Sequence, residues 1–354
     1  MTRVIRVVVV DDSAYVRKVI KQMLSRSPFI EVVGTSRDGE EALEAVKELQ
    51  PDVVTLDLIM PGMGGLGFLE RQMARQPLPV IVVSISNESS QQVLEALDLG
   101  AVDFVQKPSA LATEKVLEMS EELVSKVKAA AAIPMKRVQA APRKEVQGRT
   151  PARLGIPARK LDVIVVGLST GGPQALKQVF PLLPADFPVP IVVVLHMPAG
   201  YTEMYAASLG NLTQLKTVHA NENDELKPGH LYIAQAGRHL TLQRNSGSVR
   251  IHLDARPLDL LHRPSVDVLF RSAAETFGDK VLGIVMTGMG DDGKAGAAEI
   301  KARGGTVFTE AEETCVVYGM PRSVVEANLS DRVIPLQQMA NALSEVAYGK
   351  STDS

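Results

Sequence analysis

The chain has 354 residues, of which 45% are hydrophobic and none is tryptophan, so it is long enough for two domains with separate apolar cores. Its formal net charge of −3 combines two acidic regions, residues 1–128 and 161–354, with a basic strip at 129–160. The strip contains no Phe, Tyr or Trp, which argues against a nucleic-acid-binding face and favours a solvated linker.

No segment of the sequence indicates an oxidising compartment or a membrane. The single cysteine, Cys315, allows no intramolecular disulfide, and we expect it to be a small buried side chain rather than a catalytic thiol. The N-terminal segment places an acidic pair directly after a short apolar run, unlike a signal peptide. No apolar run approaches the roughly 20 residues that span a bilayer. We therefore expect a cytoplasmic protein.

The first half of the chain alternates β-branched runs with segments of helical spacing. Apolar residues recur at helical intervals over 14–26 and 39–50. Such alternation is typical of parallel strands joined by crossover helices, and it predicts a doubly wound α/β domain of about five strands over residues 1–125. The strands are expected at 4–10, 30–33, 53–58, 80–85 and 102–105.

Polar side chains stand at the carboxyl ends of four of these predicted strands. In open parallel sheets, ligands bind at that edge. Each acid by itself could be a helix cap or a loop residue, but this does not explain four strand ends at once. Three carboxylates brought together repel one another, unless a hard cation such as Mg²⁺ is held there with a transferring phosphoryl group. The residues are Asp11, Asp12, Asp57, Ser84 and Lys107.

Over residues 1 to about 125, this pattern resembles the receiver domain of two-component response regulators. The resemblance implies a flavodoxin-like fold, phosphorylation of Asp57 and a histidine kinase as phosphoryl donor. It also implies a Mg²⁺ ion held by Asp11, Asp12 and Asp57, phosphoryl contacts from Ser84 and Lys107, and an aromatic switch position at Phe104.

A linker is expected between the two halves. After a predicted helix at 114–132, Ala, Pro, Arg and Lys dominate the sequence and no hydrophobic period is present. Scattered prolines are typical of an extended, semi-rigid connector. We assign residues 126–160 to this basic, Ala- and Pro-rich linker.

The second half, residues 161–346, is predicted to be an α/β domain with a parallel sheet and an antiparallel hairpin. The hairpin is expected at 230–253, where short alternating runs flank Asn-Ser-Gly. The strand candidates are 161–167, 190–195, 230–233 and 281–286.

The stretch VIVVGLSTGG, residues 163–172, leads an apolar run into a glycine-rich turn. It fails both phosphate-binding templates, because a P-loop needs Lys followed by Ser or Thr and a dinucleotide site needs G-x-G-x-x-G. It does satisfy G-x-S-x-G, and its position before a helix predicted to start at Pro173 suits a nucleophile with helix amides nearby. Ser169 could instead be only the N-cap of that helix, so the pattern needs partners.

His196 and Asp292 are candidate partners, because each follows a predicted strand of the same sheet. A nucleophilic serine needs a base, and the base needs a carboxylate that fixes its tautomer. Spacing alone leaves Asp291 as a rival to Asp292. The other histidines form no H-E-x-x-H pair for a metal, and surface placement is the default for them. They are His219, His230, His239, His252 and His262.

The order Ser169, His196, Asp292 differs from that of α/β-hydrolases, in which the acid precedes the histidine. It resembles the catalytic domain of the chemotaxis protein-glutamate methylesterases of the CheB type, over residues 161 to about 346. The resemblance rests on the motifs GLSTGGP, LHMP, LKPGHLYIA, RPSVDVLFRSAA, TGMGDDG and YGMP. It implies Ser169 as nucleophile, His196 as general acid/base, Asp292 as orienting acid and the Met289 N–H as oxyanion donor. Thr170, Gly171 and Gly172 would shape the turn.

The resemblance implies a phosphorylation-activated serine hydrolase that demethylates glutamate methyl esters, and deamidates glutamines, in chemoreceptor helices. Hydrolysis of a methyl ester needs no cofactor. The composition of the basic strip and the short apolar runs predict no nucleic-acid partner and no membrane insertion. The chain differs from the family's usual pattern at Leu168, Ile85 and Gln235, where Ala, Ser and Pro are more common. Two alternatives stay open: a receiver-controlled esterase of another signalling array, and a non-catalytic interaction module.

Overall fold

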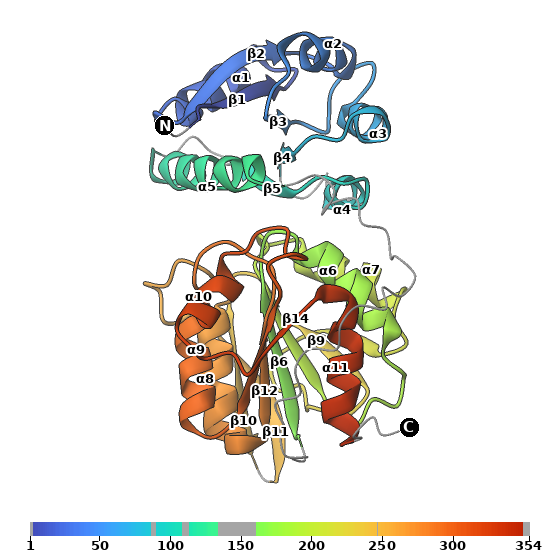
Figure 1. Ribbon diagram of the computed structural model, residues 1–354, viewed down its shortest axis with the longest axis vertical. Coiled ribbons are helices and arrows are strands. Elements are labelled where there is room, and N and C mark those ends of the chain that lie inside the picture. Colours follow the sequence, from blue (N-terminus) through green and yellow to red (C-terminus); the bar gives the residue numbers. More distant parts are fainter. Residues whose placement is uncertain (1–2, 86–89, 108–112, 134–160, 246, 350–354) are drawn as a thin grey trace. The chain divides into compact units, whose positions relative to one another are not determined.

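The structure is a computed structural model that describes residues 3–85, 90–107, 113–133, 161–245 and 247–349. The chain forms two compact units that divide after Gln139, and each unit has its own parallel sheet (Figure 1). Most of the predicted linker at 126–160 lies outside the described residues.

The first unit has a five-stranded parallel sheet with the order β2-β1-β3-β4-β5. This is the strand order of flavodoxin-like doubly wound folds, so the predicted fold of the first domain is confirmed. Because the order reverses between β1 and β3, their carboxyl ends form the crevice where such folds bind ligands. The strands are β1 (Ile5–Val10), β2 (Ile30–Ser36), β3 (Val53–Leu56), β4 (Val80–Ile85) and β5 (Asp103–Lys107).

In the described part of the first unit, four helices connect these strands and a fifth follows β5. Two of them begin at residues that satisfy their first free amides: Ser13 accepts from the Val16 N–H, and Asp38 accepts from the Glu41 N–H. The last helix continues six residues into the segment assigned to the linker and buries Val127 and Ala130 completely, so these six residues are helical rather than linker. The helices are α1 (Ala14–Leu24), α2 (Gly39–Leu49), α3 (Gly65–Arg75), α4 (Ser90–Asp98) and α5 (Thr113–Ala131).

The second unit has a seven-stranded parallel sheet with the order β14-β13-β12-β6-β7-β9-β8. Strand β6 is at the centre, between β12 and β7, so the loops after these three strands meet at one edge. The strands are β6 (Val163–Leu168), β7 (Ile191–Leu195), β8 (Lys216–His219), β9 (His230–Ile233), β12 (Val281–Val285), β13 (Thr306–Glu310) and β14 (Arg332–Ile334).

The antiparallel hairpin is confirmed, but its predicted span was too long. It comprises only β10 (His239–Asn245) and β11 (Ser248–Asp254), which pair with each other in a separate two-stranded sheet. Residues 230–233, which the hairpin prediction included, form β9 and pair in parallel with β7 and β8. The physical reason is burial, because Leu231, Tyr232 and Ile233 are all buried in the main sheet.

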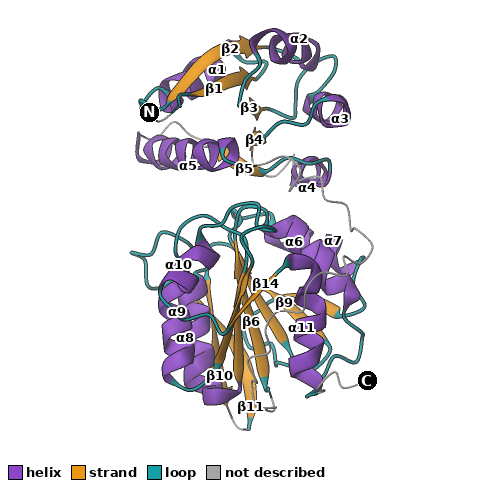
Figure 2. Cartoon of the chain, in the orientation of Figure 1, coloured by secondary structure: helices purple, strands orange, loops and turns teal. Residues whose placement is uncertain are grey.

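Helices cover both faces of the second sheet (Figure 2). On one side lie α8 (Val266–Phe277), α9 (Lys294–Ala302) and α10 (Met320–Glu326). On the other side lie α6 (Gly172–Val179), α7 (Thr202–Gly210) and α11 (Leu336–Tyr348). In the part of the chain that the structure describes, no helix is both long enough and apolar enough to span a membrane.

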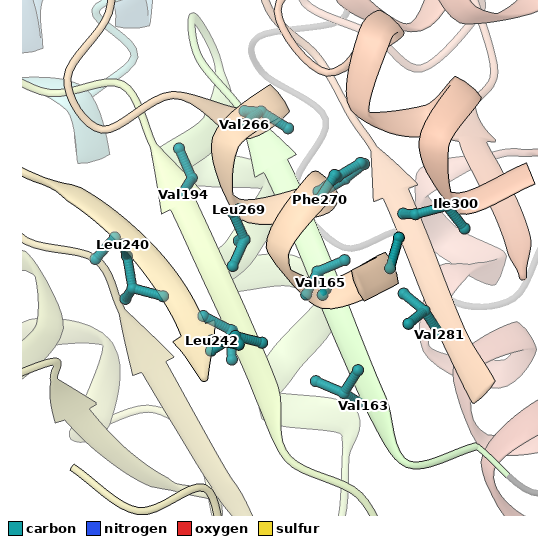
Figure 3. Packing of buried hydrophobic residues seen from close by; sticks show 14 of the residues in the cluster. Val163, Val165, Val194, Leu240, Leu242, Val266, Leu269, Phe270, Val281 and Ile300 are labelled. Atoms are coloured by element: carbon teal, nitrogen blue, oxygen red, sulfur yellow. The ribbon is translucent and has the colours of Figure 1, made fainter. Parts of the chain in front are cut away.

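Helix α8 packs between the main sheet and the hairpin (Figure 3). Its Val266, Leu269 and Phe270 are fully buried in one cluster with valines of β6 and with Leu240 and Leu242 of β10. Burying an apolar side chain of this size stabilises the fold by about 1.5–3 kcal/mol. This packing holds the N-terminus of α8 at the edge of the sheet where β6, β7 and β12 end.

Candidate functional site

Ser169 lies immediately after β6, on a turn that is held by the backbone. Its N–H donates to the carbonyl oxygen of Thr287 (3.0 Å), and its own carbonyl accepts from the Gly172 N–H (2.7 Å). The N-cap of α6 is Gly171, with φ of 79° and no side-chain hydrogen bond. The alternative in which Ser169 serves as the N-cap is therefore wrong. Among the described residues, its half-buried hydroxyl has no hydrogen-bond partner.

A glycine allows the loop after β12 to approach this serine closely. A Cβ atom built on Gly288 would lie only 2.9 Å from the Cβ of Ser169. Two residues of the following segment fix the Gly288 carbonyl oxygen, because the N–H groups of Gly319 and Met320 donate to it (3.0 and 2.9 Å). The N–H of Met289, next in the chain, has no partner within the described residues, which leaves it available to an oxyanion.

His196 is placed next to Ser169 by strand pairing. Leu195 of β7 pairs with Leu168 of β6, and the His196 N–H donates to the Leu168 carbonyl oxygen (3.0 Å). The imidazole Nε2 lies 2.8 Å from Asp292 Oδ2, and the side chains of the two residues are 7% and 12% exposed. Because a carboxylate only accepts, Nε2 carries the proton and Nδ1 is the basic nitrogen.

His196 Nδ1 is buried and has no hydrogen-bond partner among the described residues. It is thus the nitrogen that can take a proton from a serine. In the usual serine-protease triad the two ring nitrogens have the opposite roles. The ring of His262 stacks on that of His196, with centroids 4.0 Å apart and an interplanar angle of 22°.

Asp292 lies against the N-terminus of α8. It accepts hydrogen bonds from the Ser265 hydroxyl (2.9 Å), the Val266 N–H (2.8 Å) and the Asp267 N–H (2.9 Å). Burial alone would raise the pKa of Asp292, but the hydrogen bond and charge of His196 and the helix amides outweigh it and lower the pKa to about 2. Asp291 is exposed. The structure therefore pairs Asp292, not Asp291, with the histidine.

Two residues that the sequence did not single out support this arrangement. Asp267, in the first turn of α8, accepts from the N–H groups of Gly293 (2.9 Å) and Gly296 (2.6 Å) at the start of α9. Its burial raises its pKa. Ser265 is the N-cap of α8, and its hydroxyl accepts from the Val268 N–H (3.4 Å). A serine followed two residues later by an acid, within the motif RPSVDVLFRSAA, is a common helix-capping pattern and was the signal that could have identified them.

We expected the remaining histidines to lie at the surface. This is wrong for His239, and His262 is only partly exposed. His239 is fully buried, and its Nδ1 accepts from the Ser265 N–H (3.2 Å) while its Nε2 donates to the Pro257 carbonyl oxygen (3.0 Å). Burial lowers the pKa of His239, so it stays neutral. His262 is half-buried, because its ring covers that of His196. Cys315 is buried, as expected.

In the first unit, three predicted carboxylates lie together. Ligand atoms of Asp11, Asp12 and Asp57 all lie within 4.8 Å of one another. Lys107 Nζ lies 2.6 Å from Asp11 Oδ2 and 2.7 Å from Asp57 Oδ2. Burial raises the pKa of Asp57, although Lys107 opposes this. A compact set of carboxylate oxygens fits a hard divalent cation such as Mg²⁺.

The other two predicted residues of this edge come from the neighbouring strands. Ser84 is completely buried in β4 and pairs in register with Gln106 of β5. Phe104 is buried in β5, and Lys126 Nζ lies 5.7 Å from the centroid of its ring. Both lie on strands that continue to the same edge as Asp57.

The three departures from the usual family pattern have different settings. Leu168 is completely buried at the end of β6, against the turn at Gly172. The Gln235 side chain donates to Asn221 Oδ1 (3.1 Å) at the surface. The side chain of Ile85 lies outside the described part of the chain.

Comparison with known proteins matches each half of the chain to a family. The model of the CheB methylesterase family matches residues 164–343, and that of the response regulator receiver domain matches residues 7–119. A protein-glutamate methylesterase/protein-glutamine glutaminase 5 from Myxococcus xanthus is 50% identical over 337 residues, covering 95% of this chain and 96% of that protein. A protein-glutamate methylesterase/protein-glutamine glutaminase from Halalkalibacterium halodurans is 42% identical over 340 residues, covering 96% and 97%.

Among solved structures, the catalytic domain of the Thermotoga maritima CheB methylesterase is 42% identical, with a TM-score of 0.52. The match covers 53% of this chain and 100% of that domain. The relatives named above match over nearly their full length, and the family model matches half of the chain. The chain therefore belongs to the CheB methylesterase family and carries a response regulator receiver domain at its N-terminal end.

Proposed function

We propose that this protein is a phosphorylation-activated serine hydrolase that removes methyl groups from glutamate methyl esters in chemoreceptors. The observation that carries the proposal is the His196–Asp292 pair. His196 directly follows β7, the strand beside the one that leads into Ser169, and its Nδ1 has no partner among the described residues. The names of the relatives support both the methylesterase activity and a glutaminase activity. These groups also argue against the alternative of a non-catalytic interaction module, which would not need an aligned acid and base.

In the acylation step, the Ser169 hydroxyl attacks the ester carbonyl while His196 Nδ1 takes its proton. Asp292 stabilises the imidazolium that forms, and the Met289 N–H donates to the oxyanion. The tetrahedral intermediate then collapses: the C–O bond to the methoxy group breaks, and His196 returns the proton so that methanol leaves. Water, deprotonated by the same nitrogen, hydrolyses the acyl-enzyme to glutamate and free Ser169.

Glutamine follows the same sequence of steps with ammonia as the leaving group. His196 then protonates the amide nitrogen instead of the methoxy oxygen. An amide is a poorer substrate than an ester because its leaving group is more basic, so deamidation depends more strongly on this proton transfer. Thr170, Gly171 and Gly172 keep the turn in the conformation that exposes the hydroxyl.

For the receiver, we infer that Asp57 accepts a phosphoryl group from a histidine kinase. Asp11, Asp12 and Asp57 would hold Mg²⁺, which neutralises charge on the phosphoryl oxygens when bound. Lys107 already contacts Asp57. Ser84 and Phe104 lie on β4 and β5, the two strands that follow β3 in the sheet. We place the receiver at 1–131, up to the end of α5, the linker at 132–160 and the catalytic domain at 161–346, in a protein of the cytoplasm.

The test is methanol release from methylated receptor by Ser169→Ala. We expect turnover to fall by several orders of magnitude with the circular dichroism spectrum unchanged, because a reacting oxygen is lost rather than core volume. Ser344→Ala is the matched control, since it removes a hydroxyl from α11 that bonds only within its helix (3.0 Å to the Ala340 carbonyl). Turnover of Ser169→Ala within tenfold of the unaltered protein would refute the nucleophile assignment.

A further inference from the structure

A buried acid that the proposed chemistry does not use lies next to the catalytic edge. Glu310 is the last residue of β13, the strand beside β12, and its side chain is completely buried. Within the described residues it forms no salt bridge. An isolated buried carboxyl group is costly unless it is neutral and fully hydrogen-bonded, so its contacts indicate its role.

One carboxyl oxygen of Glu310 holds the start of the turn that carries Met289. Glu310 Oε2 accepts from the Thr287 N–H (2.9 Å). Thr287 in turn accepts from the Ser169 N–H through its carbonyl oxygen (3.0 Å). The Thr287 hydroxyl donates to the Thr170 carbonyl oxygen (2.9 Å) and accepts from the Val317 N–H (3.0 Å). Thr287 thus links Glu310 directly to the nucleophile Ser169, and it lies two residues before the oxyanion donor Met289.

The second carboxyl oxygen contacts a hydroxyl that can either donate or accept. Glu310 Oε1 lies 3.0 Å from Thr314 Oγ1, which also lies 3.2 Å from the Ala311 carbonyl oxygen and accepts from the Leu336 N–H (3.1 Å). When Glu310 is ionised, Thr314 donates to it. When Glu310 is protonated, it can donate to Thr314, which then donates to Ala311. The network therefore accommodates both protonation states without an unpaired group.

The surroundings of Glu310 favour the neutral state. Burial raises the pKa of Glu310 to about 7, although the Thr287 N–H, Thr314 and Cys315 stabilise the charged form. Cys315 Sγ lies 3.9 Å from the Glu310 carbonyl oxygen. On β14, Arg332 is engaged elsewhere, with Glu345 (3.1 Å) and over the ring of Phe308 (5.2 Å). From β12 the neighbouring side chains are apolar, and Glu312, Glu313 and Tyr318 of the next loop are exposed or half-buried.

We propose that Glu310 is a positioning residue of the oxyanion turn, residues 287–290, and that it supports catalysis only as the neutral acid. The inference rests on the proposed function. As the neutral acid, Glu310 accepts from Thr287 without placing charge near the reaction. Once ionised, it puts a buried negative charge beside the turn on which a second negative charge develops, and the like charges repel across a poorly screened interior.

The test is the pH profile of methanol release from methylated receptor, measured with the full chain and with Glu310→Gln. Both profiles should coincide on the acid side of pH 7, where Glu310 is mostly protonated. Above about pH 7 the unaltered protein should lose turnover by roughly tenfold, because a buried negative charge near the oxyanion opposes the charge that develops there. Glu310→Gln cannot ionise and keeps an acceptor for Thr287, so its turnover should stay level. KM should change little in either protein.

A second variant separates positioning from charge. Glu310→Ala removes the acceptor for the Thr287 N–H, so we expect a lower kcat at every pH. Glu310→Gln, which keeps an acceptor, should restore kcat. Coincident alkaline declines in the unaltered protein and in Glu310→Gln would overturn the inference, and so would an unaltered protein with no decline up to pH 9. An absence of methanol release at every pH would instead refute the proposed function and this inference with it.

Discussion

The catalytic acid is prepared by groups that belong to the backbone of a helix. Asp292 accepts from two N–H groups and one hydroxyl at the N-terminus of α8 and still contacts His196. Because its folded pKa is lowered to about 2 from 3.8, the stability that it contributes is present above pH 3.8 and is lost as pH falls through 2. Asp292 therefore stays ionised throughout the neutral range.

Exchanging the neighbouring aspartates tests this assignment. Asp292→Asn should lower turnover by about 10³- to 10⁴-fold, because an amide can donate to Nε2 and so favours the wrong imidazole tautomer. Asp291→Asn is the matched control, since Asp291 is exposed, and its turnover should stay within about threefold. Steady-state rates of methanol release decide between them. If Asp291→Asn were the more damaging change, Asp291 rather than Asp292 would be the acid that orients His196.

Helices α8 and α9 cap each other through two aspartates, one of which is the catalytic acid. Asp292, two residues before α9, accepts from the first N–H groups of α8, and Asp267, in the first turn of α8, accepts from N–H groups at the start of α9. The exchange fixes the loop that carries Asp292 relative to a helix buried under the hairpin. The position of the acid is therefore set by helix packing and not by its loop alone.

Asp267→Ala should destabilise the protein by about 1–2 kcal/mol, as loss of a capping side chain does, and lower turnover more than tenfold by loosening the Asp292 loop. Asp267→Asn is the control. Both N–H groups donate to the same oxygen, Oδ1, which an asparagine retains. Urea unfolding and methanol release measure the two effects. Equal losses in both variants would show that the charge of Asp267, rather than its acceptor atom, is what matters.

Glu310, at the end of β13, makes the free energy of unfolding depend on pH. The folded pKa of Glu310 is raised from 4.5 to about 7, so unfolding releases protons between these values and stability falls as pH rises from 4.5 to 7. Glu310→Gln should match the unaltered protein near pH 4 and exceed its free energy of unfolding by about 3 kcal/mol above pH 8. Denaturant titrations at both pH values test this. A constant difference across the range would contradict it.

The sequence predicts the features that adjacent residues determine, but not those that depend on segments far apart in the chain. Apolar runs such as VIVVG at 163–167, and the polar residues that follow such runs, are local features of the sequence. Asp11, Asp57, Ser169 and His196 could therefore be assigned to strand ends. Asp292 needed a family comparison, because the directions of two adjacent side chains depend on α8. The stacking of His262 and the burial of Glu310 depend on distant segments. No local pattern encodes them.

At the level of the whole chain, the two units have separate sheets and separate cores. The solved structure of the Thermotoga maritima relative is of its catalytic domain. We expect the receiver to restrain the esterase until Asp57 is phosphorylated. Phosphorylation adds about 1.5–2 negative charges next to Lys107, which can bias a two-state receiver surface.

Truncation tests the restraint. A chain that begins near Lys160 should release methanol from methylated receptor faster than the unphosphorylated full-length protein. A small ester, which reaches Ser169 more easily than a receptor helix does, should show a smaller difference between the two chains. Should the truncated chain prove no faster on receptor, the receiver would not act as an inhibitor, although the esterase assignment would stand.

Methanol release from methylated receptor, with and without a phosphoryl donor and Mg²⁺, tests the central claim most directly. We predict that the donor accelerates the full-length protein, that Asp57→Asn stays at the low rate in both conditions, and that Ser169→Ala releases almost nothing in either. Equal rates with and without the donor, in a protein shown to be phosphorylated, would contradict phosphorylation control. Release that survives Ser169→Ala would contradict the serine mechanism itself.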